Sequence, residues 1–461
     1  MSKLIPDALR TAVLPTVETM EIQTQIIEPL VATKTFCRFQ LDRIGILDSG
    51  SAIQIGIVAP LQSDDAKVCL PIKTGIHSAV KRAVLRIGEK VIAITDEYGK
   101  YQTIHRSFKS CEEKSQKEMV TKGCVDVCAP NTLNVSGLGL GVYQLRDTSL
   151  QGIGAGRNSQ APFPQFLIGT NADNTPFFHI KLSELFPMMR SVQLPLAYID
   201  TACVVELFFN TQAGDDDEEG TLAIFSEGEV EATKECHVEP TSLRFLCDYL
   251  TYSDDRMEQT RRAIFNEGLV IPYEDIVTTS TNFPSAVAPT DLTIVRDLGV
   301  SSMTVKGILG HYENNPTNPL LGKYASTAFA TPETLQLRVN DKQVFQQPLV
   351  SESEKENHIA QMFGTDMSVL NAEYSLDMTT NADHVTTNFM FENPGAVEDQ
   401  FMGHPQVQLG GSQHFIGCDF SSPGNYGVKV GQKPMQVTTQ VTYSATDLGG
   451  RDVTYYSLVE R

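Results

Sequence analysis

The chain has 461 residues, of which 41% are hydrophobic and 20% are charged. This length predicts two domains of roughly 200 residues each, and the composition excludes a disordered or coiled-coil protein. The 36 basic and 56 acidic residues leave a net charge of −20, and Lys3 and Arg10 are the only cations among the first thirty residues. We therefore expect neither a basic arm nor direct nucleic-acid binding, because both need cations to neutralise phosphates.

The sequence also bears on the compartment in which the protein folds. No basic-then-apolar signal segment opens the chain, and no apolar run reaches the ~18 residues that span a bilayer. The nine cysteines form an odd set without regular spacing, and several lie in apolar, strand-like runs. We predict free, buried thiols in a protein made in the cytoplasm or the nucleus.

Short runs rich in Val, Ile, Thr, Phe and Tyr, broken by Gly, Pro, Asn and Asp, dominate the chain and are typical of β-strands. In segment 334–350, apolar and polar residues alternate up to the turn pair Asn340-Asp341, and we expect a return strand that starts with Val344 and Phe345. Segments 435–445 and 452–460 predict a second hairpin around residues 447–450. Further strands are predicted in the runs 37–46, 52–61, 82–95, 203–210 and 303–312.

Two stretches predict helices. Lys109–Val120 consists mostly of good helix formers with a polar surface. In Ser253–Phe265, Ser253 can cap the first turn, acidic residues follow it, and Met257, Ile264 and Phe265 share one face, so this helix should lie on a sandwich. Long helices between strands, which a parallel α/β fold requires, are nearly absent.

Long loops without an apolar pattern are predicted at about residues 130–165 and 210–240. The first is rich in Gly and Pro, and the second contains the acidic run Asp215–Glu219, which we expect to be solvated. Insertions of this size between strands suit a sandwich whose loops lie on an outer surface.

Several residues superficially suggest a binding site. Gly152, Gly154 and Gly156 resemble a nucleotide loop, but a proline-rich stretch follows them, where a phosphate loop needs a helix. A flexible loop is the better interpretation. The acidic run 215–219 lacks the alternate ligand spacing of an EF-hand, and Asn134-Val135-Ser136 is an isolated glycosylation triplet.

Cys124 and Cys128 have the spacing of half a zinc site, but a structural site needs four ligands, usually as two close pairs. No second pair follows at that spacing, although Cys236-His237 lies downstream. No HExxH motif, nucleophile elbow or catalytic triad pattern occurs. We therefore expect no catalytic residue, no cofactor site and no metal site, and no enzymatic activity.

The middle of the chain resembles the double jelly-roll major capsid proteins of large eukaryotic DNA viruses, virophages and polinton-like viruses. In His179–Asn210 a short amphipathic turn leads to Leu194-Pro195-Leu196 and then to an apolar strand. In Leu243–Phe265 a strand with the pair Asp248-Tyr249 runs into an acidic, Arg-rich helix, and Ile271–Ile276 stands where the family enters its second jelly roll. A weaker similarity lies in Arg43–Ile57.

The resemblance is strongest over Leu182–Ile308. Many relatives carry tryptophan at the start of the second jelly roll, whereas this chain has none. The absence bears on the subgroup, for which we favour a polinton-like virus or a similarly small relative.

The resemblance implies an all-β fold of two tandem antiparallel eight-stranded jelly-roll sandwiches, with a short connecting helix and long loop insertions. The expected division is an N-terminal arm at 1–30, a first jelly roll at 31–252, a connecting helix at 253–270 and a second jelly roll at 271–461. The implied function is that of a major capsid protein whose pseudo-hexagonal homotrimers tile an icosahedral virion shell. Its implied partners are further copies, neighbouring capsomers, penton and minor capsid proteins, and, as in many relatives, a membrane beneath the shell.

Two other functions compete with this one. A carbohydrate-binding or carbohydrate-cleaving β-sandwich protein would present aromatic platforms, and the absence of tryptophan argues against it. A minor capsid or penton protein is usually a single jelly roll, which the length and the second predicted sandwich oppose.

Overall fold

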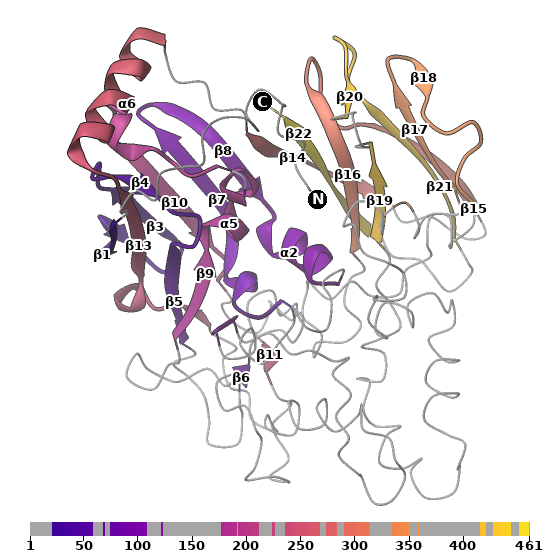
Figure 1. The fold of residues 1–461 in the computed structure, drawn as a ribbon. Helices are drawn as coiled ribbons and strands as arrows, with labels where there is room; N and C mark the ends of the chain where they lie inside the picture. Colours follow the sequence, from indigo (N-terminus) through magenta and orange to yellow (C-terminus); the bar gives the residue numbers. More distant parts are fainter. Residues whose placement is uncertain are drawn as a thin grey trace, which may run out of the picture.

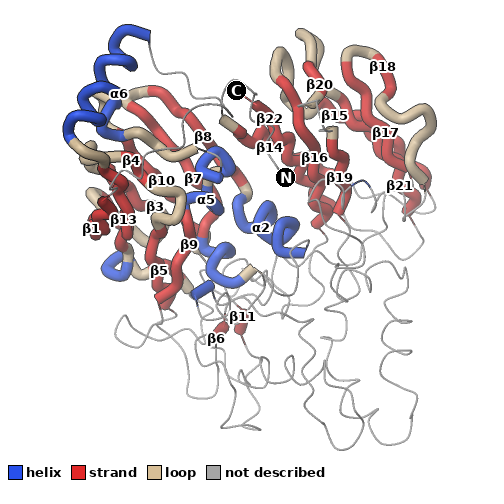
Figure 2. The backbone as a smooth tube through the Cα atoms, viewed as in Figure 1, coloured by secondary structure: helices blue, strands red, loops and turns tan. Residues whose placement is uncertain are grey.

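The computed structural model of the chain describes residues 21–58, 68–69, 74–107, 121–122, 177–190, 192–211, 224–225, 236–267, 273–283, 290–313, 334–350, 358, 415–420, 427–443 and 451–460. Within these ranges the backbone is mostly strand, arranged in antiparallel sheets with few helices (Figure 2). This confirms the all-β class predicted from the sequence. The expected number of eight strands in each sandwich stays a prediction.

The first sandwich is built from two sheets in the N-terminal half of the chain (Figure 1). One sheet has the strand order β1 (Glu21–Ile27), β13 (Arg244–Thr251), β5 (Ala52–Val58) and β12 (His237–Val238), with β4 (Ile46–Leu47) beside β13 and β9 (Phe177–Lys181) beside β5. The other has the order β2 (Val31–Ala32), β3 (Phe36–Leu41), β10 (Cys203–Phe209), β7 (Val80–Ile87) and β8 (Lys90–Asp96). A separate short pair joins β6 (Val68–Cys69) to β11 (Ile224–Phe225).

The second sandwich is built in the same way from the C-terminal half. One sheet has the order β14 (Glu274–Phe283), β22 (Arg451–Glu460), β16 (Thr304–Glu313) and β19 (Phe415–Asp419), with β20 (Val428–Lys429) beside β16. The other has the order β15 (Thr290–Asp297), β21 (Gln436–Tyr443), β17 (Thr334–Val339) and β18 (Lys342–Gln343).

The two sandwiches share one connectivity. In each, the first strand pairs with the last, and two intermediate strands complete that sheet, so β1-β13-β5-β9 corresponds to β14-β22-β16-β19. In the opposite sheets, β3-β10-β7-β8 corresponds to β15-β21-β17-β18. The short strands β2, β4, β12 and β20 are additions at the edges and ends of this common pattern.

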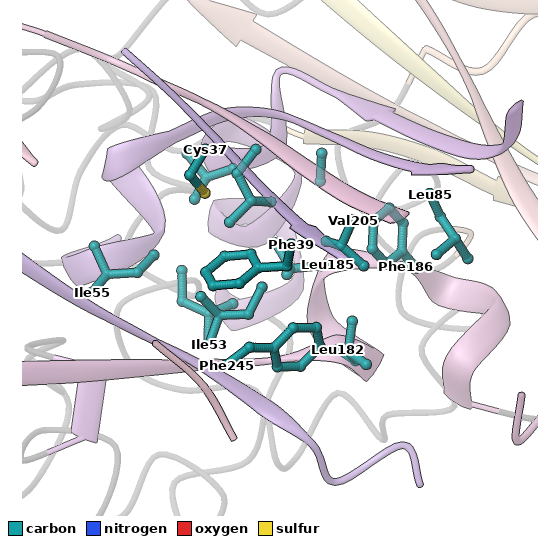
Figure 3. Close-up of a cluster of buried hydrophobic side chains, with 14 of the residues drawn as sticks. Cys37, Phe39, Ile53, Ile55, Leu85, Leu182, Leu185, Phe186, Val205 and Phe245 are labelled. Atoms are coloured by element: carbon teal, nitrogen blue, oxygen red, sulfur yellow. The ribbon is translucent and has the colours of Figure 1, made fainter. Parts of the chain in front are cut away.

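Each sandwich has its own hydrophobic core. The first core draws on residues between Cys37 and Tyr249 and is centred on side chains such as Phe39 and Phe245, whose rings meet edge to face at 5.5 Å (Figure 3). The second core draws on residues between Ile294 and Val459. Alternate residues of β3 and β17 point into these cores, as the period-2 pattern of a half-buried strand requires.

Two longer helices accompany the sandwiches. The connecting helix α6 (Asp254–Glu267) lies on the outer side of the first sandwich, with Met257 against the Tyr198 hydroxyl at 3.1 Å (Figure 1). It matches the predicted helix, including the Glu258–Arg262 pair, whose Nε–Oε1 distance is 3.2 Å. Helix α2 (Tyr98–Ser107) lies between the two sandwiches. The remaining helical turns are short: η1 (Gly75–Ala79), α5 (Leu182–Leu185), η4 (Pro187–Arg190), η5 (Leu196–Tyr198) and η6 (Pro240–Ser242).

Some local predictions were wrong. Both predicted C-terminal strands are present as β21 and β22. They belong to opposite sheets and therefore do not pair with each other as a hairpin. The turn at Asn340-Asp341 is present with φ of 51° and 62°, yet the return strand β18 ends before Val344. Helix α2 was not predicted because Gly99 and Thr103 are poor helix formers.

The remaining differences concern segment boundaries. Residues 21–27, within the range expected as an arm, form β1 and pair with β13 along their whole length. The expected loop at 210–240 contains the short strands β11 and β12. The predicted helix at 109–120 and the loop at 130–165 lie outside the described residues.

Strand β10 supplies a test of this topology. It pairs with β3 on one side and β7 on the other, so Val205 donates a ladder hydrogen bond whichever way its N–H points. We expect Val205→Pro to abolish folding, because proline removes that donor from the middle of a sheet. Circular dichroism and thermal melting measure the result.

Val205→Ala is the matched control for the lost side chain. It keeps the backbone donor and removes only two methyl groups from the core, so the variant should fold with a lowered melting temperature. A proline variant that melts like wild type would contradict the central position of β10.

Candidate assembly surfaces

The two sandwiches meet along the outer face of the β14-β22-β16-β19 sheet. Side chains on this face are buried although they lie outside the core of the second sandwich: Ile276, Leu309, His311, Thr454 and Tyr456. Helix α2, strand β8 and turn η4 of the first sandwich contact the strands that carry them. This sheet is therefore covered on both faces, by its own core and by the first sandwich.

Tyr456 lies at the centre of this contact. Its side chain is fully buried, its hydroxyl donates to the Glu97 carbonyl oxygen at 2.8 Å, and its ring lies 5.3 Å from that of Tyr101 on α2. Tyr273, just before β14, adds a hydrogen bond from its hydroxyl to the Ile92 carbonyl oxygen on β8 at 3.1 Å. These contacts join residues far apart in the chain and fix one sandwich against the other.

Glu97 forms the turn that places α2 in this interface. Its φ of 49° lies in the left-handed region, which costs a non-glycine residue energy. The chain changes direction at this turn, between β8 and α2. The carbonyl oxygen of Glu97 accepts the hydrogen bond from the Tyr456 hydroxyl. The strained residue thus lies at the contact between the sandwiches.

The corresponding sheet of the first sandwich presents a different outer face. Ile22 and Ile26 on β1 are 64% and 57% exposed, and Phe177 on β9 is 49% exposed. Between the two isoleucines, Thr24 donates from its hydroxyl to Asp248 on β13 at 2.7 Å. The face is thus a mixed apolar and polar surface on an otherwise well-packed sandwich.

A charged cluster crosses the outer face of the other sheet of the first sandwich. Glu206 on β10 is 2% exposed and accepts hydrogen bonds from Arg38 Nε at 2.9 Å and Arg86 Nε at 2.8 Å. Burial works to raise the pKa of Glu206, but the hydrogen bonds and charges of Arg86 and Arg38 outweigh it and hold the pKa below its usual value. The carboxylate therefore stays ionised and ties β10 to both neighbouring strands.

Four described cysteines are not suited to nucleophilic chemistry. Their thiols are free and buried, as predicted: Cys37, Cys203, Cys247 and Cys418. Burial raises the pKa of Cys203, Cys247 and Cys418 to about 12, and that of Cys37 still further. Thiols with such pKa values stay protonated at neutral pH, whereas the thiolate is the reactive form.

Most residues that suggested a binding site fall outside the described residues: Gly152, Gly154, Gly156, Cys124, Cys128, Asn134 and the run 215–219. Cys236 and His237 are described, and both are buried at strand β12. In the described ranges, no three His, Cys, Asp or Glu side chains gather as metal ligands. Within the same ranges, no helix has the length and apolar character needed to cross a membrane.

Two tandem sandwiches of this connectivity place the chain in the class of double jelly-roll folds. No protein-family model matches the sequence, and no curated protein matches it. Solved structures of viral capsid proteins match over nearly the whole length. The Faustovirus major capsid protein aligns with a TM-score of 0.55 at 7% identity, covering 99% of this chain and 93% of that chain.

Two further solved structures align with this chain to a similar extent. A chain in the structure of the Sputnik virophage aligns with a TM-score of 0.55 at 11% identity, covering 98% of this chain and 87% of that chain. VP54 of PBCV-1, in a crystal structure fitted into a reconstruction of Sputnik, gives a TM-score of 0.52 at 11% identity, with coverages of 98% and 96%. The chain therefore has the double jelly-roll fold of these proteins.

The interface between the sandwiches was not found from the sequence, although a local pattern pointed to it. In 452–460, Tyr455 and Tyr456 are adjacent large side chains, and a strand buried on one face should alternate apolar with polar residues. Tyr455 enters the core of the second sandwich and Tyr456 the contact with the first. Strands buried on both faces lose the alternation.

Truncation of Tyr456 tests the contact between the sandwiches. Tyr456→Ala should lower the free energy of unfolding by about 3–5 kcal/mol, because it removes a fully buried ring. Tyr456→Phe keeps the ring and loses the hydrogen bond to Glu97, so a loss of about 0.5–1.5 kcal/mol is expected. Urea denaturation measures both, and an alanine variant as stable as wild type would mean that the ring is not buried.

The Glu206 cluster predicts a pH-dependent contribution to stability. Glu206→Gln should lower the free energy of unfolding by about 1–3 kcal/mol at neutral pH, because it weakens the hydrogen bonds that the carboxylate accepts from two guanidinium groups. Because the folded pKa is lowered, this contribution is complete above the pKa of the unfolded carboxyl and disappears as the pH falls through the folded pKa. Urea denaturation at several pH values should show the wild type and the variant converging in acid.

Asp96→Asn is the matched control for Glu206→Gln. Asp96 pairs with Arg82 at 2.8 Å, but both side chains are nearly half exposed, so its loss should cost less than about 1 kcal/mol. Equal effects of the two substitutions would argue against a special contribution from Glu206.

Proposed function

We propose that this chain is a major capsid protein that assembles as a homotrimer and tiles an icosahedral virion shell. The observation that carries the proposal is the fixed pair of jelly-roll sandwiches, joined through Tyr456 and Tyr101. A shell needs a rigid block with repeated lateral surfaces, and two similar sandwiches side by side supply one. The fold shared with the Faustovirus major capsid protein supports this function.

The geometry of the block supports a trimer. Three chains contribute six similar sandwiches, which form a pseudo-hexagonal ring with one kind of contact between chains. Such a ring closes on itself, and further capsomers then pack against its outer sides. We propose the division of the chain at 31–252, 253–270 and 271–461, with β1 added to the first jelly roll.

The proposed role is structural and not catalytic, with no cofactor. The virion shell is its proposed location, after synthesis in the cytoplasm or nucleus of a host. Penton and minor capsid proteins are proposed partners, as is a membrane beneath the shell. The net charge of −20 supports a shell that does not bind the genome directly.

Light scattering coupled to size-exclusion chromatography tests the proposal. We expect the purified chain to elute as a trimer, because the outer faces of two sandwiches are available for contact with further copies. Negative-stain images should then show pseudo-hexagonal capsomers. A stable monomer at micromolar concentration that binds sugars would contradict the proposal and support the carbohydrate-binding alternative.

A further inference from the structure

We infer that the edge strand β1 pairs with β1 of a second copy, antiparallel and about a two-fold axis at Thr24. This pairing goes beyond the proposed function. A two-fold contact does not close a three-fold ring, so it links one trimer to another. Three features of β1 carry the inference: its free edge, the symmetry of its sequence and a buried amide oxygen.

Strand β1 is a free edge of its sheet. Among the described strands it pairs with β13 alone. The backbone N–H and C=O groups of every second residue therefore point away from the sheet, where a further strand can bind them. Strand β1 lies on the flank of the first sandwich that faces away from the second sandwich (Figure 1).

This edge lacks the features that usually prevent pairing with another chain, which are charged side chains, irregular register and short length. The edge strand β15 of the second sandwich carries Asp291, Arg296 and Asp297, and the edge strands β2 and β12 have only two residues each. Strand β1 has seven residues, no proline, no register shift and a single charge, Glu21 at its first position. It is therefore open to a further strand.

The sequence of β1 is symmetric about Thr24. Residues 22–26 read Ile-Gln-Thr-Gln-Ile in both directions. In an antiparallel pair centred on Thr24, Ile22 faces Ile26 of the second copy, glutamine faces glutamine, and Thr24 faces its own counterpart. Directly opposite side chains of an antiparallel pair lie on the same face and interact. A strand that is complementary to itself identifies a second copy as the partner.

The side chains of β1 gain partners in this arrangement. Ile22 and Ile26 are 64% and 57% exposed, and their pairing removes apolar surface from water at both ends of the contact. The Oε1 atom of Gln25 is buried and accepts no hydrogen bond from the described residues. The amide of Gln23 in the second copy lies opposite and can donate that hydrogen bond, which removes the cost of an unpaired acceptor.

Repulsion between the two copies is small along this edge. Glu21, the single charge of β1, faces Ile27 of the second copy and not another charge. The two Glu21 side chains lie at opposite ends of the paired strands, about 20 Å apart at ~3.3 Å per residue. This separation exceeds the Debye length of about 8 Å at physiological ionic strength.

Charge substitutions test the register. Gln23→Lys together with Gln25→Lys places lysine opposite lysine, so the rise in mass above the trimer with concentration should disappear in light scattering. Gln23→Lys together with Gln25→Glu places lysine opposite glutamate and should keep this association. The first variant lowers the net negative charge of each chain, so a general charge effect would increase association. A double-lysine variant that associates as wild type does would overturn the inference.

A cysteine on the two-fold axis tests the same register when the association is weak. Directly opposite residues of an antiparallel pair have Cα atoms about 4.5–5.5 Å apart, which is within the reach of a disulfide. Thr24→Cys should therefore give a disulfide-linked pair of chains on a non-reducing gel after mild oxidation. Glu21→Cys is the matched control, because its two copies are too far apart to be linked. Wild type on the same gel shows the background from the native cysteines.

The outcomes separate this inference from the proposed function. A trimeric wild type whose Thr24→Cys variant forms no more linked pairs than Glu21→Cys overturns the inference and leaves the capsid function standing. A monomeric wild type whose Thr24→Cys variant forms linked pairs overturns the trimer and supports the inference. If the charge variants melt at a lower temperature than wild type, the comparison of the two cysteine variants decides.

Discussion

Burial of one sheet on both of its faces determines the architecture of this protein. The β14-β22-β16-β19 sheet packs its inner face into its own core and its outer face against the first sandwich. If the sandwiches separated, the Tyr456 ring and the Ile276 and Leu309 side chains would be exposed to water. Hydrophobic burial at this sheet therefore holds the two sandwiches together as one block.

The polar groups at this contact set its geometry. Apolar burial is not directional, so it does not by itself fix the angle between two sandwiches. The hydrogen bonds from Tyr456 to Glu97 and from Tyr273 to Ile92 are directional, and each joins a side chain of the C-terminal half to a backbone carbonyl of the N-terminal half. A backbone acceptor cannot change rotamer, which makes the register of the two sandwiches specific.

The strands and the connecting helix could be predicted from local sequence, whereas their partners could not. Alternation in β17 and the acidic first turn of α6 are local properties, and both elements were found. The pairing of β22 with β14 and β16 joins segments more than a hundred residues apart, which no local pattern encodes. For the same reason a hairpin was expected from β21 and β22, which lie in opposite sheets. Helix α2 was missed because Gly99 and Thr103 give it a low helix propensity, so that tertiary contacts and not local sequence hold it.

The net charge of −20 limits how copies of this chain can associate. Like-charged chains repel one another, so attraction between copies must come from short-range burial that exceeds this repulsion. Joining two sandwiches in one polypeptide makes half of the contacts in the proposed ring intramolecular, at high effective concentration. Only the remaining contacts in the proposed ring then have to overcome charge repulsion.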